Sequence, residues 1–478
     1  MVARETTQKK PHVAVLASPG MGHVTPLLEL AKRLVVDHGF QVTFLAISTD
    51  APPAQIQLLN SSTLPPDLHV IHLPHVDVSN LLTASTGVSV RIVLVVRRTL
   101  SYLPSVLTNM QPPIQSLIVD PFCGEALEFA AAFSIPTYLF MTTSASFTAL
   151  TMYFPTLHAQ VDGDYSKIAE KVLVPGCNPL LLDDLIPGVL MPEVLPLCNR
   201  IPLVKGVFIN TWEELEPVTL GAIRKNPFFL GLPAPPVYPI GPLSKGNEDE
   251  PLTSTMESKK MLTWLDKQPP DSVVYVSFGS GGTLSGEQMS ELAWGLELSQ
   301  TRFVWVARPP SEVSASGSFF EAGYDAEGAA SYLPDGFLDR TRERGLVISS
   351  WAPQVAVLSH GSVAGFVTHC GWNSVLESIA QGVGMIAWPL YAEQSMNARM
   401  LVDMGVAVWP KPDGERAVVG RGEVERVVRS VMEGEQGKAM RQKVIELQGT
   451  ALKALGLGGS SNASLAGLAE EWRAGGSP

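Results

Sequence analysis

The segment from Trp351 to Gln394 carries aromatic, amide, hydroxyl and carboxylate side chains whose order could bind a ligand part by part. It opens with Trp351, Ala352, Pro353 and Gln354, which offer an aromatic plane beside a hydrogen-bonding edge of backbone and amide groups. A flat heterocycle such as a nucleobase can stack on such a plane and pair with such an edge. The sequence therefore predicts a base-binding site at the start of this segment.

The middle of the segment predicts a phosphate site. An apolar run over 363–367 precedes Thr-His-Cys-Gly-Trp-Asn-Ser at 368–374, a pattern that indicates a buried strand turning into a helix. A helix N-terminus presents unpaired N–H groups and partial positive charge, so it can bind a phosphate. The segment contains no Lys and no Arg. A bound anion would therefore rely on backbone amides, the Asn373 amide, the Ser374 hydroxyl and His369, and not on a P-loop lysine.

Acidic and amide side chains farther along complete the predicted ligand. Glu377 lies four residues after Asn373, on the same helix face. The two oxygens of its carboxylate can accept both hydroxyls of a ribose. A strand over 385–388 then leads to Glu393 and Gln394, a carboxylate and amide pair that fits adjacent hydroxyls of a hexose. The predicted ligand is therefore a nucleotide sugar.

The segment resembles the signature box of plant secondary-product glycosyltransferases, the UDP-sugar-dependent group of glycosyltransferase family 1. The likeness rests on its length and on its Trp, Gln, His-Cys-Gly-Trp-Asn-Ser, Glu and terminal Glu-Gln elements. In this family a terminal Gln accompanies glucose rather than galactose, and Trp372 accompanies a neutral hexose. The resemblance thus implies UDP-glucose as donor substrate, with no cofactor and no metal. Gly361 and Gly384 depart from the family, which usually has proline there; both are predicted to lie in connecting turns, where we expect local loosening only.

The resemblance also implies a role for each box residue. Trp351 would stack on uracil, Gln354 would lie along ribose and base, and Glu377 would hold the ribose. The phosphates would be held by His369, Asn373 and Ser374, and the sugar by Trp372, Glu393 and Gln394. The whole donor site implied in this way comprises Ser280, Trp351, Ala352, Gln354, His369, Gly371, Trp372, Asn373, Ser374, Glu377, Tyr391, Glu393 and Gln394.

A histidine and an aspartate in the first part of the chain are predicted to meet. His23 lies in a glycine-rich loop between a strand at 12–17 and an amphipathic helix. This loop lacks the last glycine of a dinucleotide-binding fingerprint, because Thr25 stands there. Asp120 directly follows a buried strand at 115–119. The carboxyl ends of parallel strands share one edge of a sheet, where ligands bind in open α/β folds.

Taken singly, each residue admits a structural interpretation, His23 as a capping histidine and Asp120 as a helix cap. The functional interpretation is that Asp120 accepts the ring N–H of His23, fixes its tautomer and stabilises the imidazolium. In the family that the box resembles, the residues at these two positions form the catalytic dyad. His23 would then remove the proton of an acceptor hydroxyl, and a single displacement would convert an α-linked donor into a β-glucoside.

The acceptor is expected to be a small, apolar phenol. Residues 122–205 are rich in Phe, Leu, Met and Pro, and the candidate pocket residues there are Phe122, Phe147 and Met191. The Leu-Pro-Asp-Gly-Phe motif at 333–337 is similar to that of the hydroquinone and monolignol glucosyltransferase subgroup.

Composition excludes several other classes of protein. With 478 residues, 45% of them hydrophobic and 17% charged, the chain fits two globular domains. A net charge of −12 argues against nucleic acid or an anionic membrane as partner. The four cysteines show no metal-ligand spacing, the N-terminus is polar, and no apolar stretch approaches the ~20 residues of a membrane span. We expect a cytoplasmic monomer without a membrane span.

The predicted fold class is α/β, a GT-B fold in which two Rossmann-like domains place parallel sheets across a cleft. The expected divisions are an acceptor-binding domain at 1–242, a linker at 243–256, a UDP-sugar domain at 257–455 and a returning C-terminal helix at 456–478. The Pro-rich run at 227–242 is interpreted as part of the connection between the domains.

Further elements are expected from the residue pattern. A strand at 272–278 precedes a second glycine-rich loop, and strands follow at 303–307 and 346–348. The stretch 309–332, rich in Ser, Gly and Ala, predicts a long loop that could form a mobile lid. Asp162-Gly163-Asp164 resembles the metal-binding motif of the other main glycosyltransferase fold, but no apolar strand precedes it, so it is predicted to be a turn.

Two other functions are compatible with a UDP-sugar site. A UDP-sugar epimerase with the same architecture would turn over its substrate without any acceptor. A non-catalytic UDP-sugar-binding protein would not need the pair His23 and Asp120.

Overall fold

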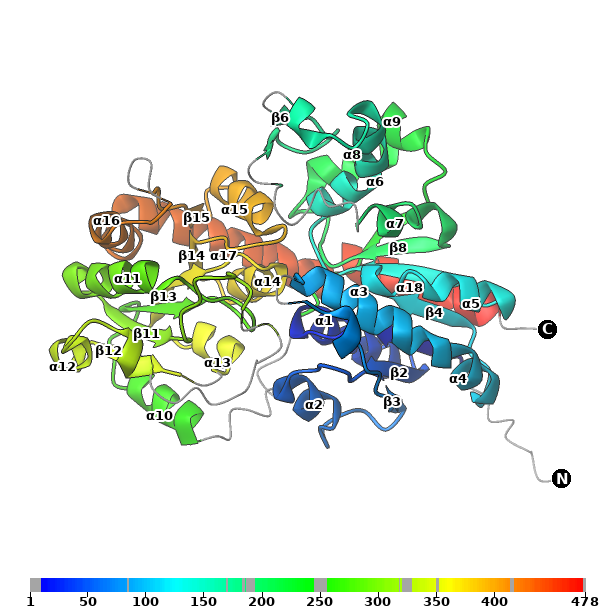
Figure 1. Ribbon diagram of the computed structural model, residues 1–478, viewed down its shortest axis with the longest axis horizontal. Helices are drawn as coiled ribbons and strands as arrows, with labels where there is room; N and C mark the ends of the chain where they lie inside the picture. Colours follow the sequence, from blue (N-terminus) through cyan, green and yellow to red (C-terminus); the bar gives the residue numbers. More distant parts are fainter. Residues whose placement is uncertain are drawn as a thin grey trace.

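The structure is a computed structural model that describes residues 10–83, 86–168, 171–182, 185, 194–244, 256–317, 319, 329–349, 352–412 and 417–475. These residues form two α/β domains that lie side by side (Figure 1), each built on one parallel sheet. The expected linker at 243–256 lies almost wholly outside the described residues. No helix in the described part of the chain is both long and apolar enough to cross a bilayer.

The first sheet has the strand order β3-β2-β1-β4-β5-β8-β9, with every neighbouring pair parallel. The central strands are apolar runs because helices cover both faces of the sheet. Its strands are β1 (His12–Ala17), β2 (Gln41–Ile47), β3 (Leu68–Leu73), β4 (Ser116–Val119), β5 (Thr137–Met141), β8 (Gly206–Ile209) and β9 (Val237–Pro239). The strands predicted at 12–17 and 115–119 are thus confirmed, the second one residue shorter.

The Pro-rich run at 227–242 does not connect the domains, and that prediction was wrong. It contains the short helix α9 (Pro227–Leu230) and strand β9, which pairs in parallel with β8 at the edge of the first sheet. An edge strand tolerates proline, because one of its sides needs no ladder hydrogen bonds. The high proline content of this run had therefore led to the wrong prediction of a linker where a strand lies.

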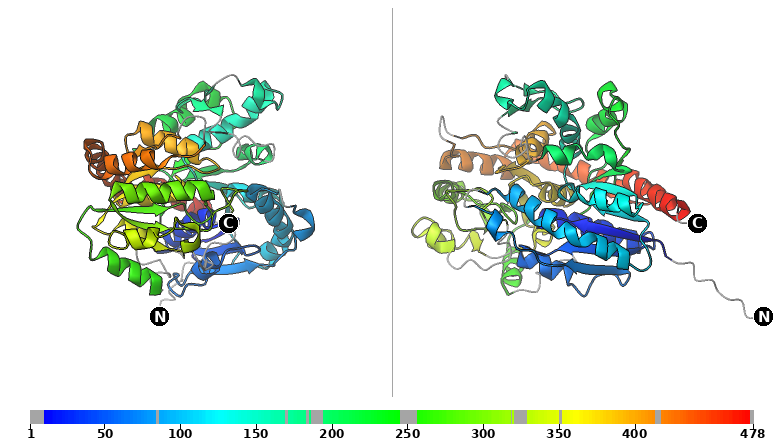
Figure 2. Two further views of the ribbon diagram at one scale, coloured as in Figure 1. Left: turned by 60° about the vertical axis from the view of Figure 1, so that its left-hand side comes forward. Right: turned by 45° about the vertical axis from the view of Figure 1, so that its right-hand side comes forward.

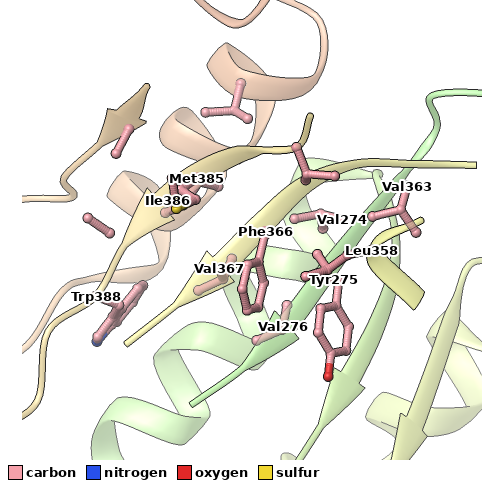
Figure 3. Close-up of a cluster of buried hydrophobic side chains, with 14 of the residues drawn as sticks. Val274, Tyr275, Val276, Leu358, Val363, Phe366, Val367, Met385, Ile386 and Trp388 are labelled. Atoms are coloured by element: carbon pink, nitrogen blue, oxygen red, sulfur yellow. The ribbon is translucent and has the colours of Figure 1, made fainter. Parts of the chain in front are cut away.

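The second sheet has the order β12-β11-β10-β13-β14-β15 and is also wholly parallel. Its strands are β10 (Val273–Ser277), β11 (Arg302–Val306), β12 (Gly345–Ile348), β13 (Val363–Thr368), β14 (Gly384–Ala387) and β15 (Ala407–Val408). Figure 3 shows apolar side chains of β10, β13 and β14 gathered in the core. Tyr275 and Phe366 stack there, with ring centroids 5.1 Å apart. The buried core holds these strands in place, and the loops that follow their carboxyl ends line the cleft.

Helices cover both sheets. In the first domain they are α1 (Met21–Val36), α2 (Pro53–Leu59), α3 (Val88–Thr99), α4 (Leu103–Asn109), α5 (Ala126–Ala132), α6 (Ala145–Gln160), α7 (Leu195–Cys198) and α8 (Pro217–Lys225). In the second they are α10 (Met256–Leu265), α11 (Gly286–Ser299), α12 (Phe337–Thr341), α13 (Gln354–Leu358), α14 (Trp372–Ala380), α15 (Gln394–Asp403), α16 (Arg421–Met432) and α17 (Glu435–Leu455).

The strand order explains where a ligand can bind. In the first sheet the order reverses between β1 and β4, and in the second between β10 and β13. At such a switch point, the loops that leave neighbouring strands diverge and open a crevice at the carboxyl edge. The loops containing His23 and Asp120 therefore start side by side, as do those containing Ser280 and His369.

The last helix, α18 (Ser460–Gly475), returns to the first domain, as Figure 2 shows. Trp472 on this helix is 5% exposed. Its ring meets those of Phe40, Tyr138 and Phe208 at centroid distances of 5.9, 5.1 and 6.1 Å. Helix α18 therefore packs on the first domain through this aromatic contact.

Loss of this aromatic contact should weaken the first domain. Replacement of Trp472 with alanine leaves a cavity between α18 and the sheet, so we expect the free energy of unfolding to fall by about 3–5 kcal/mol. Urea unfolding followed by circular dichroism measures the change. The control Leu457→Ala removes a fully exposed side chain and should change stability by less than about 0.5 kcal/mol. Equal stability of Trp472→Ala and the wild type would contradict a structural role for the helix.

The two glycines that replace the family's prolines have different environments. Gly361 lies in a turn, and an added Cβ there would meet nothing within 4 Å. Gly384 is the first residue of strand β14, so its predicted place in a turn was wrong. A Cβ at Gly384 would lie 2.6 Å from Cε of Met440 on α17. This glycine therefore allows α17 to approach the sheet closely.

Part of the loop expected to be a mobile lid is fastened to the second glycine-rich loop. The Ser311 N–H donates to the Leu284 carbonyl at 2.9 Å, and the Thr283 N–H donates to the Ala315 carbonyl at 3.0 Å. The Glu312 carboxylate accepts the Gly286 N–H at 2.7 Å, at the start of α11. Most of the remaining loop lies outside the described residues.

Candidate active site

His23 and Asp120 meet at the switch point of the first sheet. Gly20 turns the chain sharply after β1, with φ of +117°, a conformation that favours glycine. His23 then lies in the first turn of α1, and its Nδ1 is 3.4 Å from Oδ2 of Asp120. The His23 side chain is 19% exposed, whereas that of Asp120 is completely buried. The histidine thus reaches the solvent side of the pair.

Asp120 is held in place by the backbone. Its Oδ2 accepts the Ser18 N–H at 2.6 Å, and its Oδ1 accepts the Cys123 N–H at 3.1 Å, which caps a short 3₁₀ turn. Burial opposes ionisation, but the contacts with His23 and Ser18 outweigh it, so the pKa of Asp120 is lowered. Asp120 therefore caps a turn and also faces His23. Its role in catalysis stays a prediction.

Aromatic side chains surround the histidine. The Phe122 ring meets the His23 ring edge-on, with centroids 5.2 Å apart. Phe147 lies farther along the same wall, at the start of α6. A Cβ added to Gly20, three residues before His23, would lie 2.6 Å from Cζ of Phe319. Met191, the third candidate pocket residue, lies outside the described residues.

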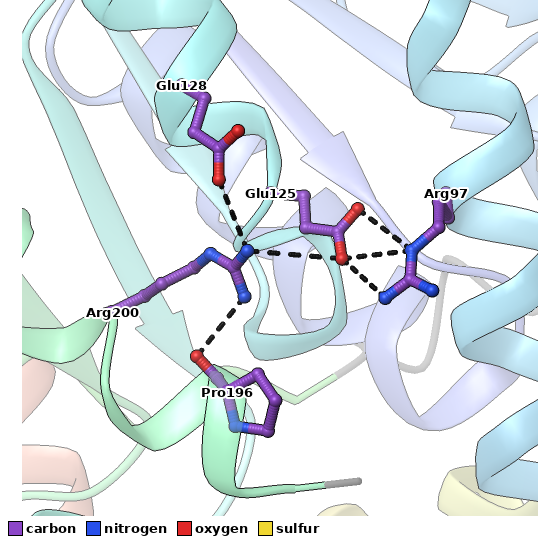
Figure 4. A network of polar contacts seen from close by, with 5 residues as sticks. All are labelled: Arg97, Glu125, Glu128, Pro196 and Arg200. Atoms are coloured by element: carbon purple, nitrogen blue, oxygen red, sulfur yellow. Dashed lines mark hydrogen bonds and ion pairs between the residues drawn. The ribbon is translucent and has the colours of Figure 1, made fainter.

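A network of charged groups joins helices of the first domain near this site, as Figure 4 shows. Arg97 of α3 donates to Glu125 at 2.7 Å, and Arg200 donates to Glu128 of α5 at 3.2 Å. Arg200 also donates to the Pro196 carbonyl at 3.2 Å. The network ties α7, which contributes Leu197 and Cys198 to the cleft, to α3 and α5.

His369 lies at the switch point of the second sheet, in a slot made by two glycines. A Cβ on Gly279 would lie 2.5 Å from its ring, and one on Gly371 would lie 2.4 Å from its Nε2. Burial lowers the pKa of His369 to about 4, so the ring is neutral at neutral pH. Its buried Nδ1 has no hydrogen-bond partner within the described structure. His369 can therefore donate a hydrogen bond to a phosphate but does not bring a positive charge.

The N-terminus of α14 opens into the same place. Gly371 is the N-cap residue, and no side chain caps the helix. The free N–H groups and the helix dipole thus remain available for an anion. Asn373 and Ser374 lie in this first turn, and Ser280 lies in the facing loop after β10. The residues that the sequence assigned to phosphate are therefore brought together.

The side chains assigned to the ribose are already connected. Nε2 of Gln354 donates to Oγ of Ser374 at 2.9 Å and to Oε2 of Glu377 at 2.6 Å. One oxygen of Glu377 is thereby oriented, and the carboxylate lines the cleft. Ala352 lines it nearby, whereas Trp351 lies outside the described residues.

The end of the box faces the space between the two domains. Oε1 of Gln394 accepts the N–H groups of Leu390 and Tyr391 at 2.8 and 3.0 Å, so any further hydrogen bond that this side chain donates must come from its NH₂ group. Glu393 and Tyr391 line the cleft beside it. Burial raises the pKa of both Glu393 and Tyr391.

Two box residues contact the first domain. The indole N–H of Trp372 donates to the Asn210 carbonyl at 2.7 Å, and the ring is 2% exposed. The Asn373 amide donates to the Gly22 carbonyl at 3.2 Å. Trp372 also lines the cleft, but its polar group is engaged by the neighbouring domain. A contact of Trp372 with the sugar remains a prediction and would involve the ring.

His23, Phe122, Phe147, Ser280 and the described donor-box residues border one cleft of about 680 Å³ between the domains. The residues that sequence reasoning missed are Ser18, Asn210, Arg308 and Phe319. Ser18 and Asn210 act through backbone atoms, so their residue types carried no signal. In the described ranges, no cluster of three or more His, Cys, Asp or Glu side chains could hold a metal ion.

Comparison with known proteins identifies the family of this chain. Residues 245–445 match the family model described as UDP-glucoronosyl and UDP-glucosyl transferase. The chain is 43% identical to UDP-glycosyltransferase 72E1 of Arabidopsis thaliana, over 97% of this chain and 96% of that protein. It is 40% identical to the hydroquinone glucosyltransferase of Rauvolfia serpentina, over 97% and 98% of the two chains.

The fold is also that of a solved enzyme complex. The structure of Phytolacca americana UGT2 with UDP-2-fluoro-glucose and pterostilbene superimposes with a TM-score of 0.84. The two sequences are 38% identical, and the similarity covers 97% of this chain and all of that one. The two parallel sheets across a cleft are thus a GT-B fold, and the chain belongs to the plant family 1 UDP-glycosyltransferases.

Proposed function

We propose that this protein transfers glucose from UDP-glucose to the hydroxyl group of small phenols, with inversion at the anomeric carbon. The observation that carries the proposal is the 3.4 Å contact between His23 and Asp120, which borders the cleft that the donor box lines from the other domain. Both halves of the cleft come from one chain, so a monomer would suffice. We also propose the division into domains at 1–242 and 257–455.

In the proposed mechanism, the acceptor hydroxyl gives its proton to Nε2 of His23 while its oxygen bonds to the anomeric carbon. The bond from that carbon to the diphosphate oxygen breaks, and its electron pair leaves with UDP. Asp120 stabilises the imidazolium that forms, since its lowered pKa keeps it ionised. One displacement from the face opposite UDP gives a β-glucoside, through a transition state with oxocarbenium character.

Proton transfer favours phenols over alcohols. A phenol with a pKa of ~10 lies about 3.5 units above histidine, so complete transfer costs about 5 kcal/mol. For an alcohol near ~16 the cost is about 13 kcal/mol. The aromatic wall formed by Phe122 and Phe147 suits the same substrates. The hydroquinone-named relative and the pterostilbene complex agree with phenolic acceptors.

The proposal is tested by UDP release from UDP-glucose with phenols, aliphatic alcohols or no acceptor. We expect release to depend on an acceptor and to be fastest with phenols, and the product to be a β-glucoside by NMR. Conversion of UDP-glucose into another UDP-sugar, without an acceptor and without net UDP release, would indicate the epimerase instead. Binding of UDP-glucose without any turnover would indicate the non-catalytic alternative.

A further inference from the structure

Cleavage of the donor adds negative charge to the diphosphate, and the cleft offers few groups to stabilise it. Residues 351–394 contain no Lys and no Arg. Buried His369 is neutral at neutral pH. Among the described residues that line the cleft, Arg308 is the one Lys or Arg. Its position is therefore relevant to the chemical step.

The backbone places Arg308 at the carboxyl edge of the second sheet. It follows the end of β11 by two residues, and the neighbouring Ala307 N–H donates to the Ile348 carbonyl at 2.9 Å. β11 lies between β12, which leads to the base and ribose residues, and β10, which leads to the loop of Ser280. Arg308 therefore leaves the sheet between the nucleoside and diphosphate positions.

The charge of Arg308 affects Tyr391, which lies beside the second glycine-rich loop. Burial and Glu393 raise the pKa of Tyr391, and the positive charge of Arg308 acts in the opposite direction. The Tyr391 hydroxyl lies 3.0 Å from the position of a Cβ on Gly281, next to Ser280. Arg308, Tyr391 and Ser280 line the same cleft, so Arg308 borders the region where the resemblance places the diphosphate.

We infer that Arg308 binds the diphosphate of UDP-glucose and stabilises the charge that develops on the leaving UDP. A guanidinium can donate two parallel hydrogen bonds to phosphate oxygens and remains charged at all relevant pH values. The inference concerns the donor side of the transfer reaction. It does not depend on which acceptor is used or on the role of His23.

The inference is tested by removing the charge and comparing UDP with uridine, which shares the base and ribose but lacks phosphate. For Arg308→Gln we expect calorimetry to show about tenfold weaker UDP binding and unchanged uridine binding. We also expect kcat with a phenol to fall by about 100-fold, as when one preorganised donor to a developing anion is lost. Arg308→Lys should recover part of both losses, because it restores the charge without the planar fork.

A matched control lies on the same strand. Arg302 is at the amino end of β11, away from the cleft, so Arg302→Gln should bind both ligands and turn over like the wild type. If Arg308→Gln does not fold, Arg308→Met keeps the apolar length of the side chain and takes its place.

Three results would overturn the inference. Unchanged UDP affinity and kcat would mean that Arg308 does not meet the diphosphate. An equal loss of uridine and UDP affinity would place it at the nucleoside or make its role structural. A Lys variant as weak as the Gln variant would show that positive charge is not what the site uses. Because the calorimetry needs no acceptor, these results are separate from a failure of the phenol-transfer proposal.

Discussion

His23→Ala is expected to lower kcat for glucosylation of a phenol by about a thousandfold, because the variant loses the general base. His23 reaches the cleft from the first domain, whereas the donor box belongs to the second. The affinity for UDP should therefore change by less than about twofold. Initial rates of UDP release and calorimetric UDP binding, measured on the same preparation, check both statements.

The matched control for this variant is His69→Ala. His69 is an exposed residue on the edge strand β3 and does not line the cleft. We expect it to retain the wild-type rate. A His23→Ala variant with near-normal rates on phenols would contradict the proposed base, even if UDP binding were intact.

Asp120→Asn should lower both activity and stability. The neutral amide cannot stabilise the imidazolium, and the comparable change in a Ser-His-Asp triad costs about 10⁴-fold in kcat, so we expect a loss of about a thousandfold. One amide N–H would also face the Ser18 or Cys123 N–H that the carboxylate now accepts. An unsatisfied buried donor costs about 1–3 kcal/mol of stability.

The combination of the two variants separates the two roles of Asp120. If Asp120 were only a helix cap, Asp120→Asn would be less stable, but its folded fraction would keep the wild-type kcat. If it acts through His23, the double variant should be little slower than His23→Ala alone, because residues that act as a unit are not additive. Urea unfolding and single-turnover rates of the three variants give both quantities.

Much of the fold was predictable because the strands are apolar runs bounded by glycine, proline and polar residues. Strand β1 begins and ends at the predicted residues. Strand β9 was hidden by prolines that only an edge position permits. The prediction of a turn at Gly384 failed for a related reason. Glycine is typical of turns, and the close approach of α17 that requires glycine at this strand position is not visible in the sequence.

The donor box was predictable for a different reason. Its residues are close in sequence, and most of them lie on or next to strand β13, helix α14 and strand β14. Local geometry therefore brings His369, Ser374 and Glu377 to the same edge of the sheet. Contacts between the two domains, such as that of Trp372 with Asn210, could not be predicted from the neighbouring residues in the sequence.

The two α/β domains, the candidate nucleotide-sugar site and the candidate pair His23 and Asp120 were predictable from the sequence, because periodicity, turn residues and the spacing of polar groups are local properties. Three features emerged from the folded structure instead: His369 is neutral, Asp120 caps a turn while it faces the histidine, and Arg308 lines the cleft. Burial and the meeting of distant loops set the charge and partners of a group, and both depend on how separate segments pack together.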